Sequence, residues 1–183
     1  MNDLALFRRK LLRNPRQVSA VTPSSRFLAA AMAEGLGPSI GRVVEFGPGT
    51  GRLTRAILAT GVAPQDLALF ELDADFVAHL RPVFPGVAVH HLGADRASEV
   101  IDPGVGAVVS GLPLLSMPTP IREAIVSAAF AILAPGAPMI QFTYGRKPPL
   151  PAESLDRLGL RAEAGRKVWA NLPPARVFRF YRA

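Results

Sequence analysis

Short apolar runs alternate along most of the chain with longer segments of helical periodicity. Runs rich in valine, isoleucine and leucine predict strands, and apolar residues spaced three and four apart predict helices. The predicted strands span residues 42–45, 67–71, 87–90, 107–110, 139–142, 160–169 and 176–181. The predicted helices span residues 3–13, 26–34, 52–59, 74–80 and 121–133.

Strands that alternate with helices indicate a mostly parallel α/β sheet with helices on both faces. No helix separates the last two predicted strands, so we expect a hairpin that makes the edge of the sheet antiparallel. The sequence shows no repeat, linker or second domain. We therefore predict one domain over residues 1–183, with an amphipathic helix in 1–16, a helical cap in 17–40 and an α/β core in 41–183.

The predicted N-terminal helix is basic and amphipathic. Its apolar residues share one face, while basic residues lie beside and opposite that face. Such a helix is typical of proteins that bind at a membrane surface, although it could also meet nucleic-acid phosphates or dock on its own domain. Its candidate membrane-contacting residues are Leu4, Phe7, Arg8, Arg9, Lys10, Leu11 and Arg13.

A glycine-rich loop separates the first strand of the alternating pattern from its helix. Glu45 ends that strand, and Gly47, Gly49 and Gly51 follow. Glycines allow the backbone to turn or to approach a ligand closely, and a strand, glycine loop and helix together form a cradle for a nucleotide-like cofactor. The spacing differs from the dinucleotide fingerprint, and the lysine of a phosphate-binding loop is absent. Glu71 ends the second strand, where an acid accepts ribose hydroxyls.

Composition narrows the chemistry. The chain has no cysteine, which excludes disulfides, zinc–thiolate sites and cysteine nucleophiles. Its net charge of +7 suggests an anionic partner, either nucleic acid or a lipid surface. No apolar run is long enough to span a bilayer, and the N-terminus lacks the pattern of a signal peptide. We therefore expect a cytoplasmic protein.

The glycine loop, in the form E-x-G-x-G-x-G, resembles motif I of the class I S-adenosylmethionine-dependent methyltransferases. The resemblance implies their Rossmann-like fold, with S-adenosylmethionine as cofactor and S-adenosylhomocysteine as product. It also implies that the leading acid faces the methionine part and that an aspartate after the third strand accepts a hydrogen bond from adenine. The residues expected to bind the cofactor are Glu45, Gly47, Gly49, Thr50, Gly51, Glu71, Leu72, Asp95, Ser110 and Leu112.

The segment after the fourth strand, Ser110-Gly-Leu-Pro-Leu-Leu-Ser-Met-Pro118, lies where methyltransferases hold the acceptor. It lacks the asparagine and the aromatic ring that bind a flat base, and we expect an apolar rim made by Leu112, Leu114, Leu115 and Met117. With residues 22–28, 45–51 and 141–145, this segment resembles the bacterial phospholipid N-methyltransferases. The resemblance implies methylation of phosphatidylethanolamine toward phosphatidylcholine at the inner face of the cytoplasmic membrane, with membrane contact by the N-terminal helix.

Other substrates remain open at this point. Family members that methylate ornithine lipids share much of the pattern, and Ser116 stands where many relatives have asparagine. Another amine, an RNA adenine, and a binding module without catalysis are further alternatives. We expect an anionic membrane surface as the partner, with no nucleic acid and no obligate protein partner.

The acceptor amine must lose a proton and point its lone pair at the methyl group of the cofactor, which is already activated, so no metal is needed. His91 and Tyr144 are the candidate catalytic residues, and His91 is preferred to His90 because it is nearer the strand end. Arg26 or Arg146 could hold the lipid phosphate. Trp169 either faces a methylated cation or packs in the core. The expected substrate-binding residues are Ser24, Ser25, Arg26, Pro113, Leu114 and Tyr144.

Overall fold

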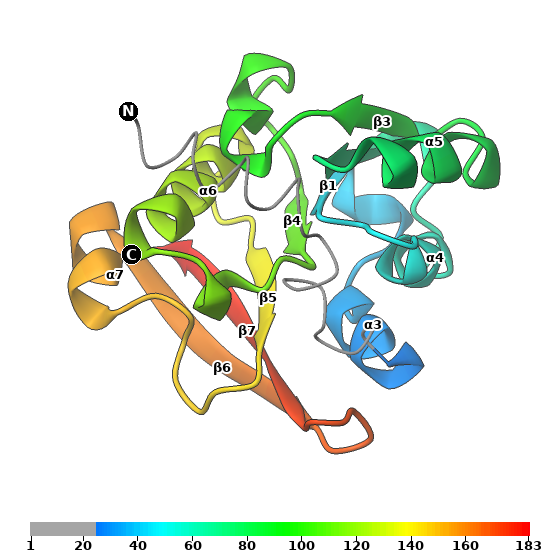
Figure 1. The fold of residues 1–183 in the computed structure, drawn as a ribbon. Coiled ribbons are helices and arrows are strands. Elements are labelled where there is room, and N and C mark those ends of the chain that lie inside the picture. The colour runs from blue at the N-terminus through cyan, green and yellow to red at the C-terminus, as the bar shows by residue number, and fades with distance from the viewer. Residues whose placement is uncertain (1–24) are drawn as a thin grey trace.

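A seven-stranded sheet with the order β3-β2-β1-β4-β5-β7-β6 forms the centre of the protein (Figure 1). The structure is a computed structural model, and it describes residues 25–183. The strands are β1 (Val43–Phe46), β2 (Leu67–Glu71), β3 (Ala88–His91), β4 (Ala107–Ser110), β5 (Met139–Thr143), β6 (Leu160–Val168) and β7 (Ala175–Arg182). The helices are α3 (Arg26–Ala33), α4 (Arg52–Leu58), α5 (Ala74–Val83), α6 (Thr119–Ile132) and α7 (Ala152–Leu158).

The sheet confirms the predicted class. Strands β1 to β5 are parallel, because a helix or a long crossover separates each from the next. The final two strands form the expected hairpin, in which β7 runs antiparallel to both β5 and β6. The antiparallel strand therefore lies one place inside the edge, and β6 is outermost.

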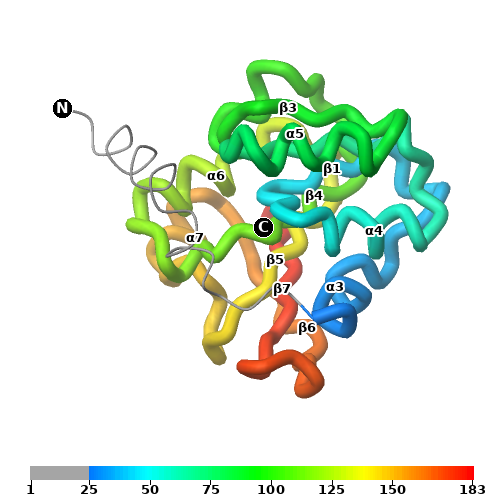
Figure 2. Tube along the Cα trace, turned by 45° about the vertical axis from the view of Figure 1, so that its right-hand side comes forward, coloured from blue at the N-terminus to red at the C-terminus, as the bar shows by residue number. Residues whose placement is uncertain are grey.

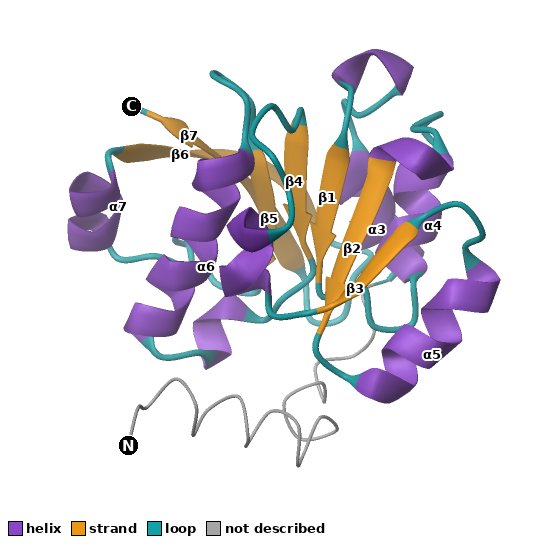
Figure 3. Ribbon diagram, turned by 90° about the horizontal axis from the view of Figure 1, so that it is seen from above, coloured by secondary structure: helices purple, strands orange, loops and turns teal. Residues whose placement is uncertain are grey.

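Helices cover both faces of the sheet (Figure 3). Side chains alternate along β1, so that Val43 packs with α3, α4 and α5 on one face while Val44 packs with α6 on the other. Glu45 lies two residues after Val43, so its side chain points to the same face, toward α4. None of the helices in residues 25–183 combines the length and the apolar character needed to cross a bilayer.

The start of α3 is tied to the turn between β6 and β7. Ser25 is the N-cap of α3, and its hydroxyl accepts a hydrogen bond from the Leu28 amide at 3.2 Å. The Ser25 amide donates to Asn171 Oδ1 at 2.9 Å, and the turn lies beside α3 in both Figures 1 and 2. Ser24 and the predicted helix over residues 3–13, with all its candidate membrane-contacting residues, lie outside the described part of the chain.

The sequence pattern did not predict α7 or four short 3-10 helices. α7 follows Pro151 and ends at Gly159, whose φ of +61° suits glycine. An ion pair between Arg157 of α7 and Glu123 of α6 joins the two helices. The 3-10 helices are η1 (Pro38–Ile40), η2 (Pro64–Asp66), η3 (Ala94–Glu99) and η4 (Leu114–Ser116).

Candidate functional site

The glycine loop after β1 requires glycine at two positions. Gly47 has φ +69°, and an added Cβ would lie 2.4 Å from Leu112 Cδ2. Gly51 has φ +76°, and its Cβ would lie 2.3 Å from the Phe84 ring. Both are left-handed conformations that side chains rarely adopt. Leu112 and Phe84 therefore pack closely against the loop, whereas an added Cβ at Gly49 would have no atom within 4 Å. We call this loop at the carboxyl end of β1 the glycine cradle.

Glu45 carries a fully buried carboxyl group at the base of this cradle. Its Oε2 accepts a hydrogen bond from Thr54 Oγ1 at 2.7 Å, while Oε1 has no partner among residues 25–183. Burial raises the pKa of Glu45 to about 8, with the charge of Glu71 adding to the effect and the bond from Thr54 opposing it. In the ligand-free protein this carboxyl is therefore protonated at neutral pH, and a cationic ligand would favour its ionised form.

Glu71 joins the end of β2 to the glycine loop. Its carboxylate accepts the amides of Gly49 at 3.1 Å, Leu72 at 2.8 Å and Asp73 at 3.0 Å. Burial raises the pKa of Glu71, and these three bonds oppose that shift because they stabilise the charged form. The carboxylate thus holds the loop in shape from the position where an acid accepts ribose hydroxyls.

The segment after β4 lies directly against the glycine loop. The Gly111 amide donates to the Phe46 carbonyl at 2.8 Å, and a Cβ on Gly111 would lie 2.8 Å from the Gly47 carbonyl oxygen. Ser110 is buried, with its hydroxyl 3.4 Å from the Leu112 amide. The carbonyl of Leu112 accepts Gln141 Nε2 at 2.9 Å, which fixes this segment to β5. The structure therefore brings the predicted cofactor and acceptor segments together.

The predicted apolar rim is only partly correct. Leu114 and Met117 are buried in the core that α6 covers, so neither side chain is available to a substrate. The 3-10 turn η4 rotates these two inward, while Leu115 is 46% exposed and Leu112 is half-buried. Half-buried Pro113 precedes η4 as its N-cap. The rim that faces the site is Leu112 and Leu115.

Arg122, on α6, holds the acceptor segment in place, and the sequence pattern did not single it out. Its guanidinium donates to the carbonyls of Met117 and Pro149, both at 2.7 Å, and lies 3.5 Å from that of Leu115. It therefore connects the segment after β4 to the one after β5. A single arginine in an apolar helix is the only local signal of this role.

The end of β5 supplies Tyr144. Its hydroxyl is buried and has no hydrogen-bonding partner within residues 25–183. Burial raises the pKa of Tyr144, and the nearby Asn171 amide partly offsets the shift. Together with Glu45 Oε1 and Gln141 Oε1, this hydroxyl completes the set of buried side-chain atoms that lack a partner in the described residues. All three are oxygens that accept hydrogen bonds, and all belong to the ends of β1 and β5.

The structure does not bring His91 and Tyr144 together. β3 and β5 are separated by β2, β1 and β4, so strand spacing alone puts their ends roughly 19 Å apart. His91 is exposed and its Nε2 lies 3.0 Å from the Leu72 carbonyl, whereas His90 stacks on Phe70. Asp95 lies in the first turn of η3, four residues after His91. These residues border the β2–β3 end of the site.

The remaining predicted contacts lie at the surface. Arg26 is exposed, with its guanidinium 4.8 Å from the centre of the Phe27 ring, and Arg146 is exposed just beyond β5. Thr50 is exposed on the glycine loop. Trp169 is 72% exposed at the turn after β6, so the interpretation that it packs in the core is wrong.

The geometry fits a cofactor that carries positive charge and a ribose. The unpartnered Glu45 oxygen, the glycine cradle and the Glu71 carboxylate occur at the carboxyl ends of β1 and β2, where such sheets bind ligands. The fold and this site define an S-adenosylmethionine-dependent methyltransferase.

Known proteins agree with this assignment. No protein-family model matches the chain. The chain is 30% identical over 156 residues to the ornithine lipid N-methyltransferase of Singulisphaera acidiphila, an alignment that covers 78% of this chain and 79% of that protein. The chain therefore belongs to the same methyltransferase family as that enzyme.

Solved structures support the fold. A TehB-like S-adenosylmethionine-dependent methyltransferase from Corynebacterium glutamicum superposes with a TM-score of 0.64 at 14% identity. The match covers 98% of this chain and 100% of that one. TrmN from Thermus thermophilus superposes with a TM-score of 0.62 at 18% identity, and the match covers 85% of this chain but 48% of TrmN. At these identities the likeness concerns the fold.

Proposed function

We propose that this protein transfers a methyl group from S-adenosylmethionine to the amine of a membrane lipid. Ornithine lipid is the first candidate, because the relative from Singulisphaera acidiphila is named for that acceptor. Phosphatidylethanolamine, implied by the sequence resemblance, is the second. The two lipids share an amine at the end of a polar head group attached to acyl chains.

One observation carries the proposal. The two unpartnered buried oxygens at the end of β5, Gln141 Oε1 and the Tyr144 hydroxyl, can both accept a hydrogen bond, and amines are donors. The exposed Leu115 and the half-buried Leu112 border the same site, and the segment between them has no aromatic ring. An amine on an apolar molecule satisfies these groups better than a flat base does, because a base needs a stacking partner.

The chain's own residues would bind and orient the reactants. When bound, S-adenosylmethionine supplies a methyl group that is already activated. The buried Glu45 carboxyl and the half-buried Glu71 carboxylate would hold the cofactor side of the site. Burial raises the pKa of Tyr144, so its hydroxyl is neutral and accepts an N–H of the amine instead of acting as a phenolate base. We assign the orientation of the amine lone pair to Tyr144 and no catalytic role to His91.

The proposal includes work at a membrane surface. The basic residues of the predicted N-terminal helix would each gain about 1 kcal/mol near anionic lipid. Such a contact would bring the protein to an acceptor that does not leave the bilayer. We propose the inner face of the cytoplasmic membrane as its location.

The test follows tritium from S-adenosylmethionine into separate acceptors: vesicles with ornithine lipid, vesicles with phosphatidylethanolamine, vesicles with neither, and ribosomal RNA. We expect label in the ornithine-lipid fraction, lost in Glu45→Ala and reduced about tenfold in Tyr144→Phe, as for loss of one orienting hydrogen bond. Tyr181→Phe, at the other tyrosine of the chain, is the matched control and should keep full activity. Label in RNA, or none in lipid despite cofactor binding, would overturn the proposal.

A further inference from the structure

Three exposed apolar side chains gather where the β6–β7 turn meets the start of α3. Trp169 is 72% exposed, Leu172 81% and Phe27 48%. We call these three residues the hairpin patch. Within residues 25–183 only Leu115, Val83 and Val100 are other large apolar side chains with comparable exposure. Apolar surface of this kind, gathered at one place, marks an interaction site.

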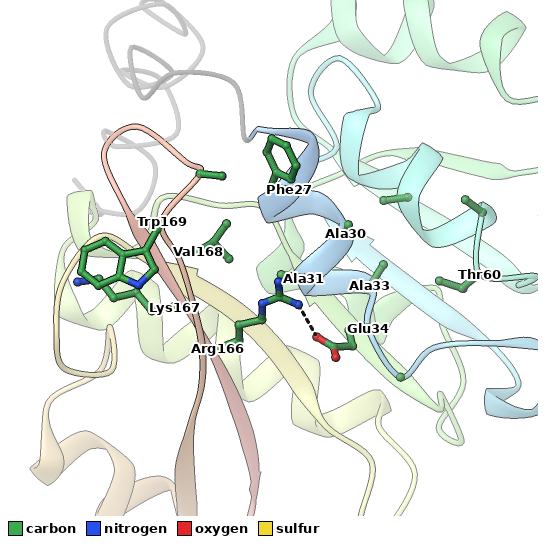
Figure 4. A pocket seen from close by; sticks show the side chains of 14 residues that line it. Phe27, Ala30, Ala31, Ala33, Glu34, Thr60, Arg166, Lys167, Val168 and Trp169 are labelled. Atoms are coloured by element: carbon green, nitrogen blue, oxygen red, sulfur yellow. Dashed lines mark ion pairs between the residues drawn. The ribbon is translucent and has the colours of Figure 1, made fainter.

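A groove of about 650 Å³ separates Phe27 from Trp169. Figure 4 shows Phe27 on the α3 side of this groove, with Trp169 and Lys167 together on the opposite side. It is separate from the glycine cradle: its walls are α3, the end of α4 and the end of β6. Alanines of α3 and α4 give it a mostly apolar floor.

Cations surround the patch. Lys167 Nζ lies 3.5 Å from the centre of the Trp169 ring, and Arg26 lies over Phe27. Arg166 has a loose ion pair with Glu34 at 3.9 Å, and both of these side chains are exposed. Tryptophan beside lysine and arginine is typical of residues at a membrane interface, where the rings enter the head-group region and the cations meet lipid phosphates.

The patch lies at the same edge of the sheet as the acceptor site. Arg176 of β7 pairs with Thr143, the last residue of β5, and the β6–β7 turn continues beyond that pair. Asn171 in this turn accepts a hydrogen bond from the Ser25 amide, which ties the turn to the start of α3. A surface that contacts the patch would therefore lie against the entrance to the acceptor site.

We propose that the hairpin patch is a membrane-docking surface, which inserts Trp169 and Leu172 into the head-group region of an anionic bilayer. Charge complementarity favours a lipid surface, because the cations border apolar tips. A nucleic acid would use the cations and the aromatic rings but would leave Leu172, the most exposed of the three, without a role. The purpose of this docking, presentation of a lipid amine, rests on the proposed function, whereas the docking itself does not.

Trp169 is the only tryptophan of the chain, so its fluorescence reports on the patch alone. The full chain is titrated with vesicles of phosphatidylglycerol and phosphatidylcholine that contain no amine-lipid acceptor. We expect the Trp169 emission to shift to the blue and to be quenched by lipids brominated near the head group. Leu172→Ser and Lys167→Glu should each weaken this response about fivefold, as expected for one apolar or one ionic contact at the interface.

Two control variants separate the patch from other exposed side chains. Val100→Ser removes an exposed apolar side chain that follows η3, and Arg81→Glu reverses a charge on α5; both should leave the response unchanged. No shift on vesicles, or a change with RNA alone, would overturn the proposal. A free protein whose emission is already blue would also overturn it, because another segment or a second copy would then cover the patch. Docking without lipid methylation would contradict only the proposed function.

Discussion

The glycine cradle and the hairpin patch lie at the same edge of the sheet, but different physical interactions shape them. The cradle consists of buried carboxyls, left-handed glycines and backbone amides that Glu71 holds in place. The patch consists of exposed apolar tips with cations around them. The difference indicates that cofactor affinity depends on desolvated charge and exact backbone shape, whereas surface contact depends on a few projecting side chains.

The two regions meet at the acceptor site. Gly111 connects the cradle to the segment after β4, through its contact with the Gly47 carbonyl. The β6–β7 turn, which carries Trp169 and Leu172 of the patch, lies just beyond the pair between Arg176 and Thr143, the residue before Tyr144. A substitution in the cradle should therefore change cofactor affinity alone, and a substitution in the patch should change membrane contact alone. A substitution at the acceptor site should also change methyl transfer.

The largest effect should come from Glu45. Because its pKa is about 8 in the folded protein and 4.5 by its ordinary value, the folded state holds a proton between these values that the unfolded chain has lost. The free energy of unfolding should therefore fall as pH rises from about 4.5 to about 8, by up to about 5 kcal/mol from this group. Glu45→Gln should remove that slope, as measured by denaturant unfolding without cofactor.

The unmodified chain and Glu45→Gln are compared over the same pH range, because all other groups titrate in both and their contributions cancel. Equal slopes would contradict the assignment of a protonated Glu45. The response of Trp169 to vesicles should be unchanged in Glu45→Gln, because the patch makes no contact with this carboxyl.

Glu71→Ala should weaken cofactor binding about 100-fold, because three backbone amides lose a charged acceptor and the ribose loses its partner. Calorimetric titration with S-adenosylmethionine measures this change. Glu153→Ala, at an exposed acid of α7, serves as the matched control. Unaltered affinity in Glu71→Ala would place the cofactor elsewhere.

Gly111→Ala should lower both cofactor affinity and methyl transfer, each by about tenfold, a moderate overpacking effect. Its Cβ would lie 2.8 Å from the Gly47 carbonyl oxygen, so the two segments must move apart. At Gly37 the nearest atom to an added Cβ is 3.7 Å away, so Gly37→Ala is the control. A loss of methyl transfer with unchanged cofactor affinity would show that Gly111 does not couple the glycine loop to the acceptor segment.

Phe27→Ser should have the smallest effect. It should weaken vesicle binding about threefold, because Phe27 is less exposed than the other two patch residues and contributes less apolar area. Vesicle flotation measures the binding, and cofactor affinity should not change. Val83→Ser, on α5, removes an exposed apolar side chain outside the patch and should behave as the unmodified chain does. A larger loss in Val83→Ser than in Phe27→Ser would contradict the location of the patch.

The strands and the cradle were readable from sequence because their signals are local. β2 and β4 have their predicted bounds, and the acids and glycines of the cradle lie on short stretches where spacing alone sets geometry. Helix α7 was missed because it is short and lies in a proline-rich segment. The strand bounds and the residues of the cradle could be predicted without knowing the order of the strands in the sheet.

The acceptor side depends on distant parts of the chain. The burial of Leu114 follows from packing against α6, and the separation of His91 from Tyr144 follows from the sheet order. The exposure of Trp169 follows from the position of the β6–β7 turn beyond β5. No periodicity in the sequence specifies these arrangements, so the patch could be recognised only in the folded structure.

The most direct measurement compares methyl transfer to ornithine lipid in vesicles with transfer to a short-chain form dissolved as monomers. It uses the unmodified chain and the double variant Lys167→Glu, Leu172→Ser. We expect the methyl-transfer rate of the double variant to fall about tenfold or more on vesicles and to be unchanged on monomers. Equal rates on vesicles, or an equal loss on both acceptors, would contradict the claim that this methyltransferase reaches its lipid through the hairpin patch.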